Sequence, residues 1–356
     1  MKDLKIKSNP LRNSGFFFLF AILVFNAGCG TFSGRGVTNI YVSGMYIAND
    51  KRIACYWKDG KKTDLYYGSG NSFAKAITIA PDGSVYAAGY YYADANSIAC
   101  YWKDGVKTDL QKGQGSSIAE DIAITKDGAV YVAGKYFNGK TYTACYWKNG
   151  EKTDLYKGQG HSYAEAIAAA SDGAIYIAGW YFDNSKSRAC YWKDGVITDL
   201  NSGSGFSYAY AIAIDLRGSV YIAGSYIDGD KTIACYWKNG EKIPLYAGTG
   251  YSYARGIAID KNGSVYVAGY YEDAGKWTAC YWKDGIKTNL YNISGFSYAW
   301  GIAISGDGAI HIASRYKNGG KETACYWKDG IKTDLYYGHD DSFAEDIAVV
   351  TTKRKP

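Results

Sequence analysis

One pattern of apolar and polar positions recurs along most of the chain. A period that starts near residue 163 holds four strand-like segments, at 164–170, 174–182, 188–193 and 196–200. Short turns rich in Asp, Asn, Ser and Gly separate these segments, and short apolar or aromatic segments between such turns are typical of β-strands. The pattern therefore predicts four antiparallel strands in each repeat.

The repeat length comes from the heptapeptide ACYWKDG, which first stands at residues 54–60. Its cysteine recurs every 45 residues, at Cys55, Cys100, Cys145, Cys190, Cys235, Cys280 and Cys325. Between the third and fourth segments every copy has Asp-Gly or Asn-Gly, as at Asp59-Gly60 and Asn149-Gly150. Both residues tolerate the positive φ of a type I′ hairpin turn. Four antiparallel strands in a repeat of this length are typical of a β-propeller blade.

The two ends of the repeated region complement each other. Residues 37–44 match a second strand with no first strand before it, and residues 342–350 match a first strand with no second strand after it. One C-terminal and three N-terminal strands would thus form the seventh blade and leave no free sheet edge. A linear solenoid would need polar capping repeats, which the sequence lacks. We predict an all-β fold, a monomeric seven-bladed β-propeller over residues 37–350.

The side-chain sizes predict the strand order within a blade. The first segment has Ala or Gly at most positions, such as Ala164, Ala166 and Ala168, so it should lie at the crowded axis. The Tyr and Trp of ACYWK would fill the wider space further out. The seven repeat cysteines would then lie on different blades. Because packed sheets lie ~10 Å apart and disulfides need closer Cα atoms, we expect buried free thiols.

The charge of the chain lies mainly at its ends. The net charge is +6, of which residues 1–28 and the basic tail, residues 351–356, each supply +3, so the repeated body is neutral. A neutral body without a basic stripe argues against nucleic acid as a partner.

The three histidines lie far apart and show no metal-ligand spacing. No nucleophile elbow or phosphate loop appears. The sequence predicts no cofactor, no metal and no catalytic residue, and an enzyme is the less favoured reading.

The N-terminus has the pattern of a targeting segment. A basic start is followed by an apolar run from Gly15 to Phe25, too short to span a bilayer. This pattern predicts a secretory signal peptide over residues 1–28. Export to the cell envelope follows from this prediction.

The residues around Cys29 resemble a bacterial lipobox, with Ala27-Gly28 directly before the cysteine. Asn26 stands where that pattern usually has Leu. The resemblance implies cleavage before Cys29, lipid attachment to it and an outer-membrane lipoprotein, with residues 29–36 as a short tether. An ordinary secreted protein cleaved nearby is the alternative.

The repeat frame itself resembles a known family. Its order is A-C-Y-W-K-D-G-x-K-T-D-L, then S-x-A-x-x-I-A, then D-G-x-V-Y-x-A-G. This frame is similar to the HAF-type extracellular repeat of bacteria over roughly residues 37–350. It departs from that family in having Cys-Tyr for Phe-Leu and Ala for Asn after the Ile. The resemblance implies an exported repeat protein and no defined activity.

The copies differ mainly in segments that a blade places on one face of the ring. The residue before the crossover Ser is Asn71, Ser116, His161, Phe206, Tyr251, Phe296 or Asp341. The residue at the start of the innermost strand is Lys75, Glu120, Glu165, Tyr210, Arg255, Trp300 or Glu345. Trp180 and Trp277 also occupy variable positions. These rows predict a ligand site at the mouth of the central channel.

The expected site has two arcs. Its aromatic arc comprises Trp180, Phe206, Tyr210, Tyr251, Arg255, Trp277, Phe296 and Trp300. The opposite arc is acidic and carries Asp340, Asp341, Glu345, Lys75, Glu120 and Glu165. Such a mouth suits an envelope or host protein, a peptide or a glycan. Three other readings stay open: unrestrained drift at exposed positions, a purely structural envelope protein, and a glycosidase or lyase that uses Glu120 and Glu165 as a carboxylate pair.

Overall fold

The structure is a computed structural model. It describes residues 36–352 with gaps at 112–114, 184–185, 201–204, 247, 291–294 and 337. The predicted signal peptide, the lipidation site Cys29, the tether up to residue 35 and the tail from residue 353 lie outside the described residues. Every regular element that the structure describes is a β-strand.

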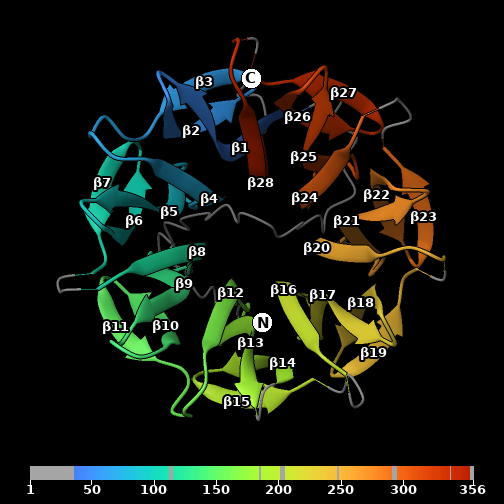
Figure 1. The fold of residues 1–356 in the computed structure, drawn as a ribbon, viewed down its shortest axis with the longest axis horizontal. Coiled ribbons are helices and arrows are strands. Elements are labelled where there is room, and N and C mark those ends of the chain that lie inside the picture. The colour runs from blue at the N-terminus through green and yellow to red at the C-terminus, as the bar shows by residue number, and fades with distance from the viewer. Residues whose placement is uncertain are drawn as a thin grey trace, which may run out of the picture.

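Seven four-stranded antiparallel sheets stand as blades around a common axis, which confirms the predicted β-propeller (Figure 1). The innermost strands are β4 (Ser72–Ile79), β8 (Ser117–Ile124), β12 (Ser162–Ala169), β16 (Ser207–Ile214), β20 (Ser252–Ile259), β24 (Ser297–Ile304) and β28 (Ser342–Thr352). The second strands are β5 (Val85–Ala93), β9 (Val130–Phe137), β13 (Ile175–Asp183), β17 (Val220–Asp228), β21 (Val265–Asp273), β25 (Ile310–Asn318) and β1 (Val37–Ala48).

The outer half of each blade is a hairpin of a longer and a shorter strand. The third strands are β6 (Asn96–Lys103), β10 (Tyr142–Lys148), β14 (Lys186–Lys193), β18 (Lys231–Lys238), β22 (Lys276–Lys283), β26 (Lys321–Lys328) and β2 (Lys51–Lys58). The outermost are β7 (Val106–Asp109), β11 (Glu151–Asp154), β15 (Val196–Asp199), β19 (Glu241–Pro244), β23 (Ile286–Asn289), β27 (Ile331–Asp334) and β3 (Lys61–Asp64).

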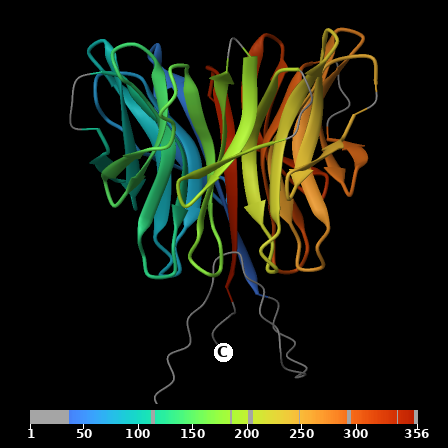
Figure 2. The same cartoon turned by 90° about the horizontal axis from the view of Figure 1, so that it is seen from below.

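The ring closes as predicted, in a blade of order β28-β1-β2-β3. β28 pairs with β1 from Thr352 and Val37 to Ser342 and Tyr46, and runs two residues past Val350, the predicted end. The end of β28 and the start of β1 lie at one face, the lower face in Figure 2. The inner strands therefore begin near the opposite face, here called the upper face, where the loops between second and third strands also lie.

The Asp-Gly and Asn-Gly pairs adopt the predicted turn in all seven blades. Asp59 has φ 49° and Gly60 φ 81°, and the other pairs are alike. The Asp or Asn side chain also bonds back to the sheet, as Asp59 Oδ1 accepts a 2.8 Å hydrogen bond from the amide N–H of Ile40. The Oδ1 atoms of these Asp and Asn residues therefore accept hydrogen bonds that hold the hairpin to the second strand.

The ACYWK segment forms the core between blades. Cys100 and Trp102 pack on Ala54 and Leu65 of the preceding blade. All seven repeat cysteines are fully buried free thiols, as predicted. Burial raises the pKa of every one of these thiols above its ordinary value. They act as small core residues, without a thiolate for chemistry.

The Ser of the S-x-A segment joins neighbouring blades. Ser72 Oγ in β4 accepts a 2.8 Å hydrogen bond from the amide N–H of Ala54 in β2. The same bond recurs at every blade boundary, with the Ser buried each time. The two segments of the repeat frame are thus the two sides of one interface.

Candidate functional site

A β-bulge at the same place in every innermost strand positions the candidate site. In β4 the register shifts between Ala74 and Ala76, so Lys75 is the extra residue. A bulge redirects a side chain. The residues in these bulges form what we call the inner ring: Lys75, Glu120, Glu165, Tyr210, Arg255, Trp300 and Glu345. This set is the row predicted from the sequence.

A second row of variable residues backs the inner ring. It comes from the second strands and, called the second ring here, comprises Met45, Tyr90, Lys135, Trp180, Ser225, Tyr270 and Arg315. Sequence reasoning selected only Trp180 from this row and missed Lys135, Tyr270 and Arg315. Their variation from copy to copy was the available signal, because each stands first in its blade's variable segment.

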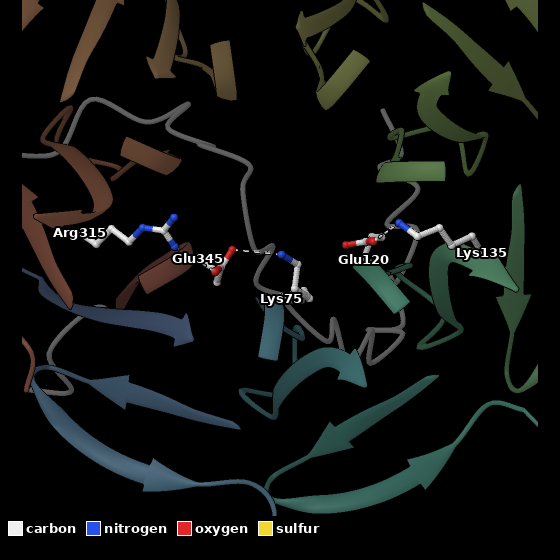
Figure 3. Close-up of polar contacts among 5 residues, drawn as sticks. All are labelled: Lys75, Glu120, Lys135, Arg315 and Glu345. Carbon is white, nitrogen blue, oxygen red and sulfur yellow. Dashed lines mark hydrogen bonds and ion pairs between the residues drawn. The ribbon is translucent and has the colours of Figure 1, made fainter. Parts of the chain in front are cut away.

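Ion pairs within the inner ring and between the two rings lie on one side of the axis (Figure 3). Lys75 Nζ lies 3.2 Å from Glu345 Oε2, across a blade boundary. Lys135 Nζ lies 2.5 Å from Glu120 Oε1, and both side chains are largely buried, at 13% and 11% exposed. Arg315 Nη1 lies 3.8 Å from Glu345 Oε1. The arc predicted to be acidic is therefore mixed in charge, because Lys135 and Arg315 join Lys75 beside its carboxylates. We call it the charged half.

The carboxyl groups of the charged half differ in their pKa. Burial would raise the pKa of Glu120, but Lys135 and Lys75 outweigh it, so the pKa of that carboxyl is lowered. Glu165 makes no hydrogen bond or ion pair with the residues that the structure describes. Burial, together with the charge of Glu120, raises its pKa against the opposing effect of Lys135. Glu165 is thus a carboxyl group facing the axis without a fixed partner.

Opposite the charged half, Arg255 lies among aromatic rings. Its Cζ is 4.1 Å from the centroid of the Tyr210 ring and 5.0 Å from that of Trp300. Its Nε and Nη2 donate to the hydroxyl of Tyr270, at 3.3 Å and 3.0 Å. Burial raises the pKa of Tyr210 to about 12, so this phenol stays neutral. We call Tyr210, Arg255, Tyr270 and Trp300 the aromatic half.

Aromatic contacts extend this half to two of the predicted tryptophans. Trp180 lies 5.1 Å from Tyr208, whose ring stacks 6.1 Å from Tyr210. Trp277 lies 5.5 Å from Tyr270 on the other side. The structure therefore brings Trp180 and Trp277 into one aromatic network with the inner ring.

In the crossover row His161 is linked to this network, because its ring stacks 6.3 Å from Tyr163, which lies 4.0 Å from Trp180. The other members of the crossover row lie apart from the network. The polar members of the row accept main-chain hydrogen bonds, as Asn71 Oδ1 does from the N–H of Arg52 and Asp341 Oδ1 from the N–H of Glu322. The aromatic members Phe206, Tyr251 and Phe296 do not offer such an acceptor near the main chain. Phe has none, and the hydroxyl of Tyr251 stands at the far end of its ring. Within the described residues no ring contact joins these three to the inner ring. Tyr251 and Phe296 are 42% and 40% exposed on the upper side.

Two aspartates that the sequence analysis did not single out follow the bulges. Asp121 accepts hydrogen bonds from the N–H of Ile122 and, across the blade boundary, from that of Ile167, both at 2.7 Å. Asp346 makes the equivalent bond across its boundary, at 3.1 Å from the N–H of Ile77. Burial and the charge of Asp346 raise the pKa of Asp121 to about 8. Burial raises that of Asp346 to about 6.

Across the described part of the chain, no group of three or more His, Cys, Asp or Glu is arranged to hold a metal ion. The same residues include no helix long and apolar enough to cross a bilayer.

Comparisons with known proteins bear on the fold. No family model and no curated protein matches the sequence. Among solved structures, TolB from Agrobacterium tumefaciens is 11% identical, with a TM-score of 0.44 over 90% of this chain and 99% of that one. An ulvan lyase from a polysaccharide lyase family is 10% identical, with a TM-score of 0.52 over 86% and 91%. Tricorn protease is 9% identical, with a TM-score of 0.52 over 92% of this chain and 36% of that one. At these identities the likeness shows the fold alone.

Proposed function

We propose that the protein is an exported cell-envelope lipoprotein whose propeller is a glycan-binding module, with the ligand held at the upper end of the axis. The observation that carries the proposal is the inner ring. On a frame that repeats ACYWK and its turns almost unchanged, the bulge residues at the axis are lysine, glutamate, tyrosine, arginine and tryptophan. Packing alone does not require such variety at equivalent positions.

The chemistry of the two halves suits a sugar. Aromatic side chains supply apolar surface for the faces of pyranose rings, and a few directed polar groups fix orientation. Each ion pair of the charged half, such as Glu120 with Lys135, presents an acceptor beside a donor. A sugar hydroxyl both donates and accepts, so it is a natural partner for such pairs.

A glycan array probed with the full chain tests the proposal. The double variant Tyr210→Ala, Trp300→Ala is expected to lose capture of every glycan that the wild type binds. Tyr67→Ala is the matched control, because Tyr67 is 86% exposed at the outer side of the ring. Capture by the double variant at the wild-type level would contradict the site.

Lipid attachment needs a separate test, because Cys29 lies outside the described residues. Metabolic labelling with a palmitate analogue in a bacterial host is expected to mark the wild type and not Cys29→Ser. Equal labelling of both would exclude the anchor and leave the binding site unaffected.

One observation favours a second candidate, glycoside cleavage. The pKa of Glu120 is lowered and that of Glu165 is raised, and a carboxyl pair with its pKa values moved apart can divide the roles of base and acid. An activity screen on polysaccharides would then detect turnover that Glu165→Gln and Glu120→Gln both abolish. A screen without hydrolysis removes this candidate.

A further inference from the structure

We infer that Arg255 forms an anion subsite that takes the carboxylate of an acidic sugar, a uronic acid residue within the bound glycan. This inference rests on the proposed function and adds the substrate class. It starts from the one feature that separates Arg255 from the cations of the charged half, the absence of a carboxylate beside it.

The four axial cations differ in their partners. Lys75, Lys135 and Arg315 each lie within ion-pair distance of a glutamate. Arg255 makes no ion pair with any residue that the structure describes. A partly buried cation without a counter-charge is costly, and it is stabilised when a ligand brings the anion.

The guanidinium of Arg255 is held in one orientation. Its Cζ lies over the ring of Tyr210 on β16 and near that of Trp300 on β24, so strands from three blades surround it. The hydroxyl of Tyr270 accepts from Nε and Nη2. The N–H groups of Nη1 have no acceptor among the described residues. A guanidinium held in this way suits a planar carboxylate, which it can bind through two parallel hydrogen bonds.

The groups across the axis point to a sugar as the carrier of that carboxylate. Glu165 lacks a fixed partner, and its charge interacts with that of Arg255. The hydroxyls of the same sugar or of the next one are groups that Glu165 and the Glu120–Lys135 pair can bind, because a hydroxyl both donates and accepts. A peptide ending in a free carboxylate would satisfy Arg255 but would offer few hydroxyls to these groups.

The test compares two forms of one ligand. An oligogalacturonide of defined length and its fully methyl-esterified form are titrated against the full chain by calorimetry. We expect the ester to bind at least tenfold more weakly than the acid, because it lacks the anion. Arg255→Gln should lower affinity for the acid by about 10- to 100-fold, the range for a charge-assisted hydrogen bond. It should leave affinity for the ester within about twofold.

Two further variants separate binding from folding. Tyr270→Phe removes the hydroxyl that positions Arg255, so it should reduce the preference for the acid by less than Arg255→Gln does. If Arg255→Gln fails to fold, Arg255→Lys decides: it keeps the charge, loses the planar fork and should show a reduced preference for the acid. Arg188→Gln is the matched control, because Arg188 is exposed and paired with Asp183 at another place.

The outcomes are distinct. Equal binding of acid and ester, or an equal loss of both in Arg255→Gln, overturns the anion subsite and leaves glycan binding standing. Capture of neutral glycans alone would also overturn the anion subsite and leave glycan binding standing. Binding of peptides with a free C-terminal carboxylate, with no glycan bound, overturns both this inference and the proposed function.

Discussion

The charged half and the aromatic half of the axial rings share one backbone and differ in how they hold a cation. In each, a bulge on the innermost strand and a second-ring residue bring two side chains together. In the charged half Lys135 meets the carboxylate of Glu120. In the aromatic half Arg255 meets the Tyr270 hydroxyl and the ring faces of Tyr210 and Trp300.

The difference separates stability from binding capacity. An ion pair compensates its own charges, so removing one partner leaves the other buried and alone. A cation among aromatic rings is stabilised only in part and keeps free hydrogen-bond donors. An external anion therefore meets cations that are already paired on one side of the axis and an unpaired cation, Arg255, on the other.

The largest expected effect is in the charged half. Lys135→Met leaves Glu120 without its ion partner in a largely buried place, so the free energy of unfolding should fall by about 3 kcal/mol. Adding Glu120→Met should restore more than half of that loss. Urea denaturation measures both. The matched control is Lys152→Met, whose exposed pair with Asp154 at 3.0 Å should be worth less than about 1 kcal/mol. If Lys135→Met and Lys152→Met lowered the free energy of unfolding equally, the prediction that the buried pair contributes more than the exposed pair would be contradicted.

The aromatic half should respond less. Arg255→Met keeps a chain that packs on Tyr210 and Trp300. The lost cation–π contact and hydrogen bond cost about 1–2 kcal/mol, but removal of an unpaired, partly buried cation offsets part of this, so the net loss should be below about 1 kcal/mol. Adding Glu165→Gln should restore little of that loss, because the charges of the two residues interact but no ion pair joins them. Recovery in this double variant, of the kind expected for Lys135 and Glu120, would show that Arg255 and Glu165 are a pair.

Among the carboxyl groups at the axis, those of the charged half should contribute most to the pH dependence of stability, because Asp121 and Asp346 have no acidic counterpart near Arg255. A carboxyl whose pKa rises on folding binds its proton more tightly in the native state, so stability falls as pH rises. For Asp121 this window runs from about 4, the unfolded value, to about 8. Asp121→Asn should flatten the decline, and Asp346→Asn should move it to lower pH by removing a neighbouring charge. Thermal melts at several pH values test this, and an unchanged profile in both variants contradicts it.

The smallest effect concerns two buried thiols, which can report local opening in the two halves. Cys145 lies in the blade of Lys135, and Cys280 in the blade of Arg255. We expect Lys135→Met to speed alkylation of Cys145 several-fold more than that of Cys280, since lost contacts favour local unfolding. Arg255→Met should show the reverse bias, more weakly. Peptide mass spectrometry after iodoacetamide measures both. An equal change at both sites would indicate global unfolding instead.

The sequence predicted the ring because the signals were local to the backbone. Pairs such as Asp59-Gly60 encode positive φ directly, and the incomplete ends at 37–44 and 342–350 identify the closing blade. The inner ring was also accessible, because its residues vary while those around them repeat. Each of these predictions needed only the comparison of copies within the chain.

The pairing of side chains at the axis was not predictable in the same way. The bulge at Lys75 lies between Ala74 and Ala76 and has no glycine of its own to mark it. Unless the bulge is known, the direction of the inner-ring side chains cannot be derived, and neither can their contacts with Lys135, Tyr270 and Arg315. For the same reason the expectation of an acidic arc, which included Lys75, did not show that Glu345 pairs with Lys75 and Glu120 with Lys135.

The closing blade has a consequence for how the chain reaches its native state. Of the described strands β1 is the first along the chain and its inner neighbour β28 is the last. The two pair over some 313 residues, as Thr38 does with Thr351. Until β28 has paired, β1 has an unpaired edge and the seventh blade is incomplete. Non-local pairing of this kind is slow, and an unpaired edge can recruit other chains. A transcript cut short before residue 342 would therefore yield an aggregation-prone product, although most of its strands are present.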